Sequence, residues 1–271
     1  MLTPFSIWIP ADTWSGLDVF KLLELVEQRH IRETTVQRVL TSRMRDAVTP
    51  FTKNIDTFLE QFEKNRGVLA GATAVDIMLS HNDVSRLSLH LLFPRDEGAK
   101  FREYVVLVHG YMELDAFYDD HDNSNVRFIQ RLWNPTTGRN LLVLESRTNN
   151  AISPLSKFTT SCDSTFISTH WYCVVYATLF ESRTAVMFTG EDLQPPSRIE
   201  RIQAHYIARG FEWINAYPSF WRIVGDGESL VGGLSADYDV DRILDALNPG
   251  VAWRVLNRGS ALVVDAYQIT N

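Results

Sequence analysis

The stretch that most constrains the fold runs from Gly67 to Pro94. It begins with a short apolar segment, residues 67–70, which is typical of a buried strand. Gly71 then supplies the backbone freedom that a sharp turn from a strand into a helix requires. Residues 74–79 are predicted to be helical, and Thr73 stands near the start of this helix, where a hydroxyl can satisfy unpaired backbone N–H groups. An unobstructed helix N-terminus of this kind attracts anions such as phosphate.

The second half of this stretch is predicted to be a strand. Residues 86–93 alternate in polarity, so Ser88 and His90 share one face of the strand and the intervening leucines share the other. Pro94 ends the alternating segment. The stretch therefore predicts two strands connected by a glycine turn and a helix, with Ser88 and His90 facing the same way.

This layout resembles the nucleotidyltransferase superfold, in particular a set of uncharacterised fungal proteins with that fold. In that family a Gly-Ser turn opens the helix, and an Asp-x-Asp strand ending in Pro follows. The matching pieces here are Gly71-Ala72 and the segment from Ser88 to Pro94. Further segments that resemble family motifs follow in the same order: Leu141–Ser146, Pro154–Ser161, Tyr176–Leu179 and His205–Phe211. The resemblance covers roughly residues 50 to 215.

The resemblance implies an α/β (α+β) fold, in which a nucleotidyltransferase-like mixed β-sheet is flanked by helices and preceded by an N-terminal helical segment. We expect residues 1–52 to form that segment and residues 53–271 to form the nucleotidyltransferase-like domain. Within this domain, residues 53–215 would be the core and residues 216–271 a C-terminal extension.

The family's chemistry depends on acidic side chains that this sequence lacks. The resemblance implies that two Asp on alternate strand positions, with a third carboxylate on a neighbouring strand, hold Mg²⁺ against a nucleotide triphosphate. Ser88 and His90 stand at the two Asp positions, and Leu142 stands at the third. Mg²⁺ requires oxygen ligands, usually charged ones. We therefore predict that metal-dependent nucleotidyl transfer has been lost. We expect no catalytic residues, no metal site and no cofactor.

A ligand-binding cleft would remain if the fold is that of the family. Its predicted lining residues are Gly71, Ala72, Thr73, Ser88, His90 and Glu145. Backbone amides, hydroxyls and a neutral imidazole can bind a phosphate-bearing small molecule without a metal ion. The opposing interpretation is a vestigial cleft filled by side chains.

Two alternative functions use other parts of the chain. An active enzyme that uses Mg²⁺ and a nucleotide would need a relocated metal site, built from acids such as Asp76, Asp83 or Asp115. An F-box-type substrate adaptor of a ubiquitin ligase would bind a Skp-type adaptor through its N-terminal helices. The segment Ile9–Trp14, the Leu22-Leu23 pair and residues 39–48 resemble a divergent F-box. The simpler interpretation, which we favour, is two amphipathic helices packed on their own domain.

Composition excludes several other classes. The net charge of -7 argues against a general nucleic-acid binder. Two cysteines, Cys162 and Cys173, are too few for a disulfide framework or a zinc site. The sequence has no recognisable signal peptide and no apolar run of membrane-spanning length. We expect an intracellular protein, cytoplasmic or nuclear, with no membrane partner.

Periodicity predicts the other elements of the chain. Helices are expected as a pair within residues 12–48 and over residues 54–64, 98–109 and 198–211. Strands are expected as a hairpin of residues 125–133 and 139–146, as residues 171–176, and as a closing hairpin of residues 251–256 and 261–269.

Two motifs invite functional interpretations that their spacing does not favour. Residues 119–124 look like a cation loop, but they lack the Gly and Glu of a calcium loop, so we predict a solvated turn. In the segment Gly232–Asp241 too few residues separate the Gly pair from the acids for a displaced nucleotidyltransferase motif. These acids are predicted to begin a helix instead.

Overall fold

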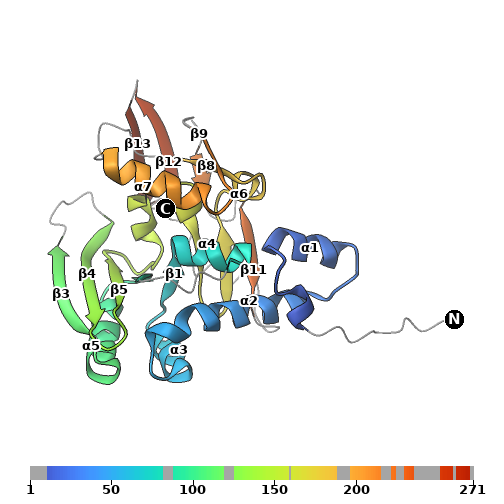
Figure 1. Ribbon diagram of the computed structural model, residues 1–271. Helices are drawn as coiled ribbons and strands as arrows, with labels where there is room; N and C mark the ends of the chain where they lie inside the picture. Colours follow the sequence, from blue (N-terminus) through green and yellow to red (C-terminus); the bar gives the residue numbers. More distant parts are fainter. Residues whose placement is uncertain are drawn as a thin grey trace.

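The protein has a mixed α/β fold, built around a large mixed sheet flanked by helices (Figure 1). The computed structural model describes residues 11–81, 88–118, 125–158, 160–187, 196–214, 221–223, 229–234, 251–258 and 261–268. The expected mixed α/β fold, with a mixed sheet flanked by helices, is confirmed. No helix among these residues is long and apolar enough to cross a membrane.

Seven α-helices lie in the described residues. They are α1 (Val19–Glu27), α2 (Glu33–Val48), α3 (Ile55–Lys64), α4 (Ala72–Leu79), α5 (Glu97–His109), α6 (Ala177–Glu181) and α7 (Pro196–Ile207). Short 3-10 helices also occur, and three of them recur below: η1 (Ala11–Trp14), η3 (Ser153–Lys157) and η4 (Cys162–Ser164).

The largest sheet has eight strands, in the order β11-β7-β6-β1-β2-β5-β4-β3. Its strands are β1 (Val68–Ala70), β2 (Ser88–Phe93), β3 (Met112–Tyr118), β4 (Val126–Asn134), β5 (Arg139–Ser146), β6 (Thr165–Ile167), β7 (Trp171–Val174) and β11 (Leu230–Gly233). Two smaller sheets pair β10 (Trp221–Ile223), β12 (Val251–Arg258) and β13 (Ala261–Gln268), and β8 (Thr184–Val186) with β9 (Glu212–Ile214).

The central unit predicted from the sequence is present. β1 pairs antiparallel with β2, so that Ala70 lies opposite His90, and α4 connects to the end of β1 through Gly71. β5 pairs with β2 in parallel, and β4 pairs with β5 as the expected hairpin. The two strands of the unit are therefore neighbours in the middle of one sheet.

The two faces of this sheet are covered differently. On one face Leu69, Leu91 and Val143 belong to a core cluster that includes the apolar sides of α1, α2, α3, α4 and α5. On the other face Leu92 and Phe166 belong to a second cluster that includes the 3-10 helix η3. In Figure 1 the N-terminal helices run along the sheet and the β12–β13 hairpin rises at its opposite end.

The N-terminal helices are part of the main core. Leu22 of α1 and Leu40 of α2 are both 0% exposed and belong to the same cluster as the sheet residue Leu69. This packing is the one expected for two amphipathic helices that pack on their own domain. Residues 9 and 10, which begin the segment that resembles an F-box, lie outside the described residues.

Most predicted elements are present with shifted ends, and several were missed. Helix α7 ends at Ile207 rather than Phe211, and the edge strand β3 was not anticipated. The short strands β6, β8, β9, β10 and β11 and the helix α6 were not predicted either. The loop of residues 119–124 and the segment 235–250 lie outside the described residues, so their predictions stay predictions.

Candidate functional site

The N-terminus of α4 is held by a backbone conformation that requires glycine. Gly71 is the N-cap of α4, with φ +68° and ψ -152°, and it has no side-chain cap. This region of conformational space is essentially restricted to glycine. Ala72 follows it and is half-buried, whereas Thr73 is only 3% exposed. The first turn of α4 therefore presents backbone amides without a side-chain cap at Gly71.

His90 packs directly against this turn. A Cβ built on Gly71 would lie 2.9 Å from Nδ1 of His90. Nδ1 is buried and has no hydrogen-bond partner among the described residues, while the residue as a whole is half-buried. Burial, with a smaller effect from His205, lowers the pKa of His90 to about 4. His90 is therefore a neutral imidazole at pH 7.

The strand registers around His90 bring the three family positions together. Leu142 of β5 lies beside His90 in the parallel pairing of β2 with β5, and Asn140 lies beside Ser88. Ser88 and His90 share a strand face, and Ser88 is half-buried. The positions predicted to correspond to the three acids of the resembling family are thus adjacent in space and occupied by a serine, a histidine and a leucine.

Two side chains from later in the chain complete the surroundings of His90. Phe158 stacks on the His90 ring, with the ring centroids 6.0 Å apart and an angle of 24° between the planes. His205, at the end of α7, lies near enough for its charge to act on His90. Both residues belong to segments that resemble family motifs, but neither was predicted to be a site residue.

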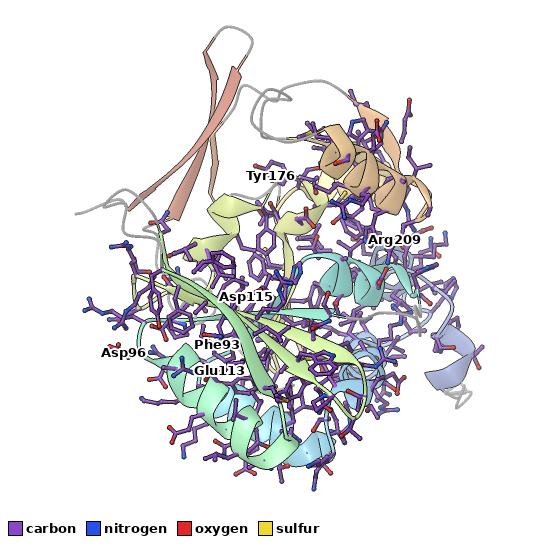
Figure 2. All side chains as sticks on the ribbon, turned by 60° about the vertical axis from the view of Figure 1, so that its left-hand side comes forward. Phe93, Asp96, Glu113, Asp115, Tyr176 and Arg209 are labelled. Carbon is purple, nitrogen blue, oxygen red and sulfur yellow. The ribbon has the colours of Figure 1, made fainter. Side chains whose placement is uncertain are left out.

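A buried ion pair connects the segment just after α7 to α4. Arg209 donates from Nε to Oδ1 of Asp76 at 2.6 Å and from Nη2 to Oδ2 at 3.0 Å. The two side chains are 6% and 1% exposed. Figure 2 shows Arg209 between α7 and α4. Since both charges are buried, removal of one partner alone would leave an uncompensated charge in the core.

A second buried contact holds α7 through Tyr206. The Tyr206 hydroxyl donates to Oδ1 of Asp163 in η4, and Thr160 donates to Oδ2 at 2.9 Å. Burial raises the pKa of Asp163, and these two hydrogen bonds partly offset the rise. Two carboxylates on different elements, Asp76 and Asp163, therefore hold α7 and its residue His205 in place.

Glu145 is not brought to this group. It lies three positions after Leu142 on β5, so its side chain is on the opposite face of the sheet. There it is 0% exposed, and it accepts from the backbone N–H of Ala99 at 3.0 Å and from Arg127 at 2.9 Å. Glu145 therefore supplies a negative charge to the N-terminus of α5.

The acids considered for a relocated metal site are separated in the fold. Asp76 pairs with Arg209, whereas Asp115 pairs with Arg131 at 3.2 Å on the edge strand β3 (Figure 2). Asp83 lies outside the described residues. Within the described ranges, no three His, Cys, Asp or Glu side chains are grouped so that they could hold a metal ion.

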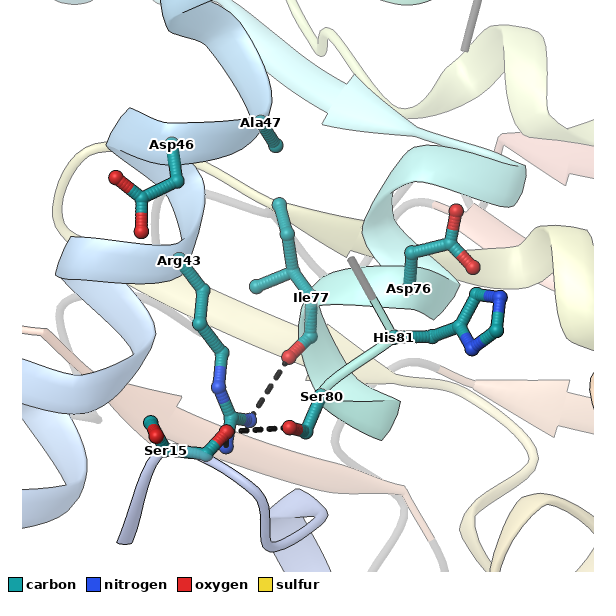
Figure 3. Close-up of a pocket in the computed structure, with 8 residues that line it drawn as sticks. All are labelled: Ser15, Arg43, Asp46, Ala47, Asp76, Ile77, Ser80 and His81. Carbon is teal, nitrogen blue, oxygen red and sulfur yellow. Dashed lines mark hydrogen bonds between the residues drawn. The ribbon is translucent and has the colours of Figure 1, made fainter. Parts of the chain in front are cut away.

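A separate pocket of about 200 Å³ lies at the opposite end of α4 (Figure 3). The Arg43 guanidinium there donates to the carbonyl oxygens of Ile77 and Ser15, each at 3.0 Å, and the Ser80 hydroxyl also donates to Ser15. Burial lowers the pKa of Arg43 to about 10. Because the C-terminal end of a helix exposes carbonyl groups, this end of α4 does not favour an anion. Arg43 instead connects the loop after η1 to α4.

The sequence matches no protein-family model and no curated protein. Among solved structures, the chain is similar to a CCA-adding enzyme in complex with ATP, with a TM-score of 0.37 and 10% identity. The same holds for a CCA-adding enzyme in complex with CTP, with a TM-score of 0.36 and 10% identity. The alignments cover 59% of this chain and 38% and 37% of those chains. Similarity at this level carries no argument about the chemistry of the site.

Proposed function

We propose that this nucleotidyltransferase-like protein binds a phosphate-bearing small molecule at the N-terminus of α4 and does not carry out metal-dependent nucleotidyl transfer. The observation that carries the proposal is the contact between Gly71 and His90 at the first turn of α4. The first-turn amides have no side-chain cap, because the N-cap residue is Gly71. They lie beside a polar ring that is neutral at pH 7.

The tautomer of His90 suits an anionic ligand. The short distance between Nδ1 and the Cβ position on Gly71 means that a Cα hydrogen of Gly71 is directed at Nδ1. A Cα–H group is a weak donor, so Nδ1 meets it with its lone pair and the ring proton resides on Nε2. We infer that Nε2–H lies at the partly exposed edge of the ring. There it can donate a hydrogen bond to a phosphate oxygen.

The absence of the family's acids at three positions supports binding without catalysis. Ser88, His90 and Leu142 lie together, and a hydroxyl, an imidazole and an isobutyl group do not form a Mg²⁺ site. Helix N-termini bind phosphate through backbone amides and the helix dipole without a metal ion. The ligand would therefore bind through its phosphate oxygens to the α4 amides and to His90.

Titration calorimetry with inorganic pyrophosphate in EDTA tests this proposal. The wild-type protein should bind, and Ala72→Asp should weaken binding at least about tenfold, because it places a carboxylate on the same amides. Thr34→Asp is the matched control, since Thr34 is exposed in the first turn of α2 and far from the site along the chain. This control should bind pyrophosphate as the wild type does.

Two results would contradict the proposal. One is a failure of the binding test: either the wild type does not bind pyrophosphate, or Ala72→Asp binds it equally well while it keeps the wild-type melting temperature. The other is release of pyrophosphate from a nucleoside triphosphate when Mg²⁺ is added, which would show that transfer chemistry is retained.

A further inference from the structure

The edge strand β3 gathers most of the exposed apolar side chains in the part of the chain that the structure describes. Every residue of β3 is exposed. Of the eight large apolar side chains exposed among the described residues, six lie on β3 or in the last turn of α5 just before it. They are Leu107, Val108, Met112, Leu114, Phe117 and Tyr118. Apolar side chains gathered in this way mark an interaction surface, whereas single exposed ones are ordinary.

The backbone of β3 is also open to pairing. β3 ends the eight-stranded sheet on one side, at the left-hand edge in Figure 1, and β4 is its only partner among the described strands. An edge strand carries outward N–H and C=O groups that can pair with another strand. The register with β4 shifts between Glu113 and Asp115 and is regular from Asp115 to Tyr118. Residues 115–118 are therefore the part of β3 that can extend the sheet.

The charges on β3 are balanced within the chain. Glu113 pairs with Arg102 at 3.5 Å, and Asp115 pairs with Arg131 at 3.2 Å. This balance matters because the chain has a net charge of -7, so that two copies would repel each other at an acidic surface. A surface whose acids are paired with arginines does not repel a copy of itself, and it does not attract a strongly charged partner such as nucleic acid.

The sequence of β3 suits antiparallel pairing with a second β3. Two such strands related by a two-fold axis place residues of the same face opposite each other. A register centred on Asp115 would set two aspartates opposite each other, which destabilises a strand pair. A register centred on Ala116 instead places Asp115 opposite Phe117 of the second copy, with the two small alanines at the axis. This register extends the sheet without a like-charge pair.

The exposed area is sufficient for a weak dimer. The six apolar side chains are between 49% and 74% exposed. At roughly 100 Å² each they present about 600 Å² in each copy. A symmetric contact would bury about 1,200 Å² in total before the strand backbones are counted, which is the lower limit of a specific interface.

We propose that β3 is the contact surface of a symmetric homodimer, in which two β3 strands pair antiparallel about Ala116 and join two eight-stranded sheets. The edge strand at the other end of the sheet, β11, is half-buried or buried along its length. Pairing of β3 with β11 of another copy would also generate an open chain of molecules rather than a closed dimer. The contact lies away from the N-terminus of α4, because β5 and β4 separate β3 from β2. The dimer is therefore independent of the proposed function.

Sedimentation velocity of the full chain over a series of concentrations tests the dimer. The wild type should change from monomer to dimer with a dissociation constant on the order of tens of micromolar. Phe117→Glu should raise this constant at least about tenfold, because it removes an apolar contact and places a carboxylate opposite Asp115 of the second copy. Ile207→Glu is the matched control, since Ile207 is 51% exposed on α7 and Phe117 is 59% exposed. This control should dimerise as the wild type does.

Amide hydrogen exchange tests whether the contact is a strand pair. Exchange within residues 115–118 should slow as the wild type dimerises, and it should stay fast in Phe117→Glu. A wild type that remains monomeric throughout the micromolar range would overturn the inference, as would unchanged dimerisation of a folded Phe117→Glu protein. Loss of the dimer in Ile207→Glu would place the contact elsewhere and would also overturn it. Protection of residues 115–118 that is equal at every concentration would show that another segment of the same chain covers β3, with the same consequence.

Discussion

At the scale of single residues, the surroundings of His90 do not stabilise the positive charge that its ring would carry when protonated. Its Nδ1 is buried against Gly71, and burial lowers the pKa of the ring to about 4 from 6.5. Because the unfolded chain binds the proton more tightly, His90 stabilises the native state above pH 6.5. This stabilisation is lost as the pH falls from 6.5 through 4.

The first prediction concerns the acid sensitivity that follows from this shift. The wild type should lose up to about 3 kcal/mol of unfolding free energy between pH 7 and pH 4 through His90 alone. His90→Gln should lack that component. Urea denaturation of both proteins across this range measures the difference, and parallel curves for the two proteins would show that His90 does not cause the loss.

The second prediction concerns Gly71, whose positive φ and contact with His90 both exclude a side chain. Gly71→Ala should lower the unfolding free energy by about 1–3 kcal/mol because of the backbone conformation alone. Contact of the new Cβ with Nδ1 should add to this loss. Gly71→Ala should therefore cost less in a His90→Ala background, as a double-mutant cycle from denaturation curves would measure. Equal costs in both backgrounds would mean that the two residues are not coupled.

At the scale of whole elements, the N-termini of the helices α4 and α5 differ in how their backbone amides are satisfied. The N-terminus of α5 receives the buried carboxylate of Glu145, whereas that of α4 has no side-chain cap. Arg127 bridges Glu145 to Asp96, the N-cap residue of α5. The α5 terminus is thus satisfied within the protein, and the α4 terminus is the one suited to an external anion.

The third prediction separates these two termini. Glu145→Gln should lower the unfolding free energy by about 2 kcal/mol, because it removes the charge from the hydrogen bonds with Ala99 and Arg127. Pyrophosphate affinity should not change, since Glu145 lies on the face opposite His90. Glu113→Gln is the control, because Glu113 is 50% exposed in its ion pair with Arg102 and should change stability by less than about 0.5 kcal/mol. Loss of pyrophosphate binding in a folded Glu145→Gln protein would show that Glu145 does contribute to the binding site.

The sequence predicted the elements whose burial pattern is regular. The central unit and the β4–β5 hairpin were predicted because their strands alternate in polarity or are uniformly apolar. β3 was missed because all seven of its residues are exposed, so that no face carries a burial signal. Strands of three residues, such as β6, β8 and β9, are too short for any period to show. Helix α7 was predicted too long because Gly210, with φ +81°, turns the chain before Phe211.

The candidate site could be predicted only where strand alternation determines the side-chain direction. Alternation placed Ser88 and His90 on one face, and the same rule applied to β5 would have excluded Glu145, because Leu142 is the residue beside His90. The contributions of Phe158, His205 and Arg209 depend on how distant segments pack together. The sequence carries no local signal for such contacts beyond the family-like segments that contain these residues.

At the scale of the whole molecule, the N-terminal helices belong to the same core as the sheet. Leu22 is completely buried in a cluster that contains residues of α2, α4 and the central strands. Three aromatic residues extend this contact toward β9. The ring centroids of Phe20 and Phe180 are 5.9 Å apart, and those of Phe180 and Phe211 are 5.4 Å apart. The chain should therefore unfold with its N-terminal helices and its sheet as one unit.

The fourth prediction follows from that shared core. Leu22→Ala should lower the unfolding free energy by about 2–5 kcal/mol, as expected for a buried leucine. Leu107→Ala is the matched control, because Leu107 is 74% exposed and should change stability by less than about 0.5 kcal/mol. Tryptophan fluorescence during urea denaturation measures both. A Leu22→Ala protein as stable as the wild type would indicate a helix that is free to bind another protein.

Anion binding at the first turn of α4 is the central claim about this protein. A proton–nitrogen-15 correlation spectrum recorded during a pyrophosphate titration in EDTA tests it most directly. The predicted result is that the amides of Ala72 and Thr73 and the Nε2–H of His90 shift together, with one dissociation constant. Binding that leaves these three signals unchanged, or the absence of binding, would contradict the account.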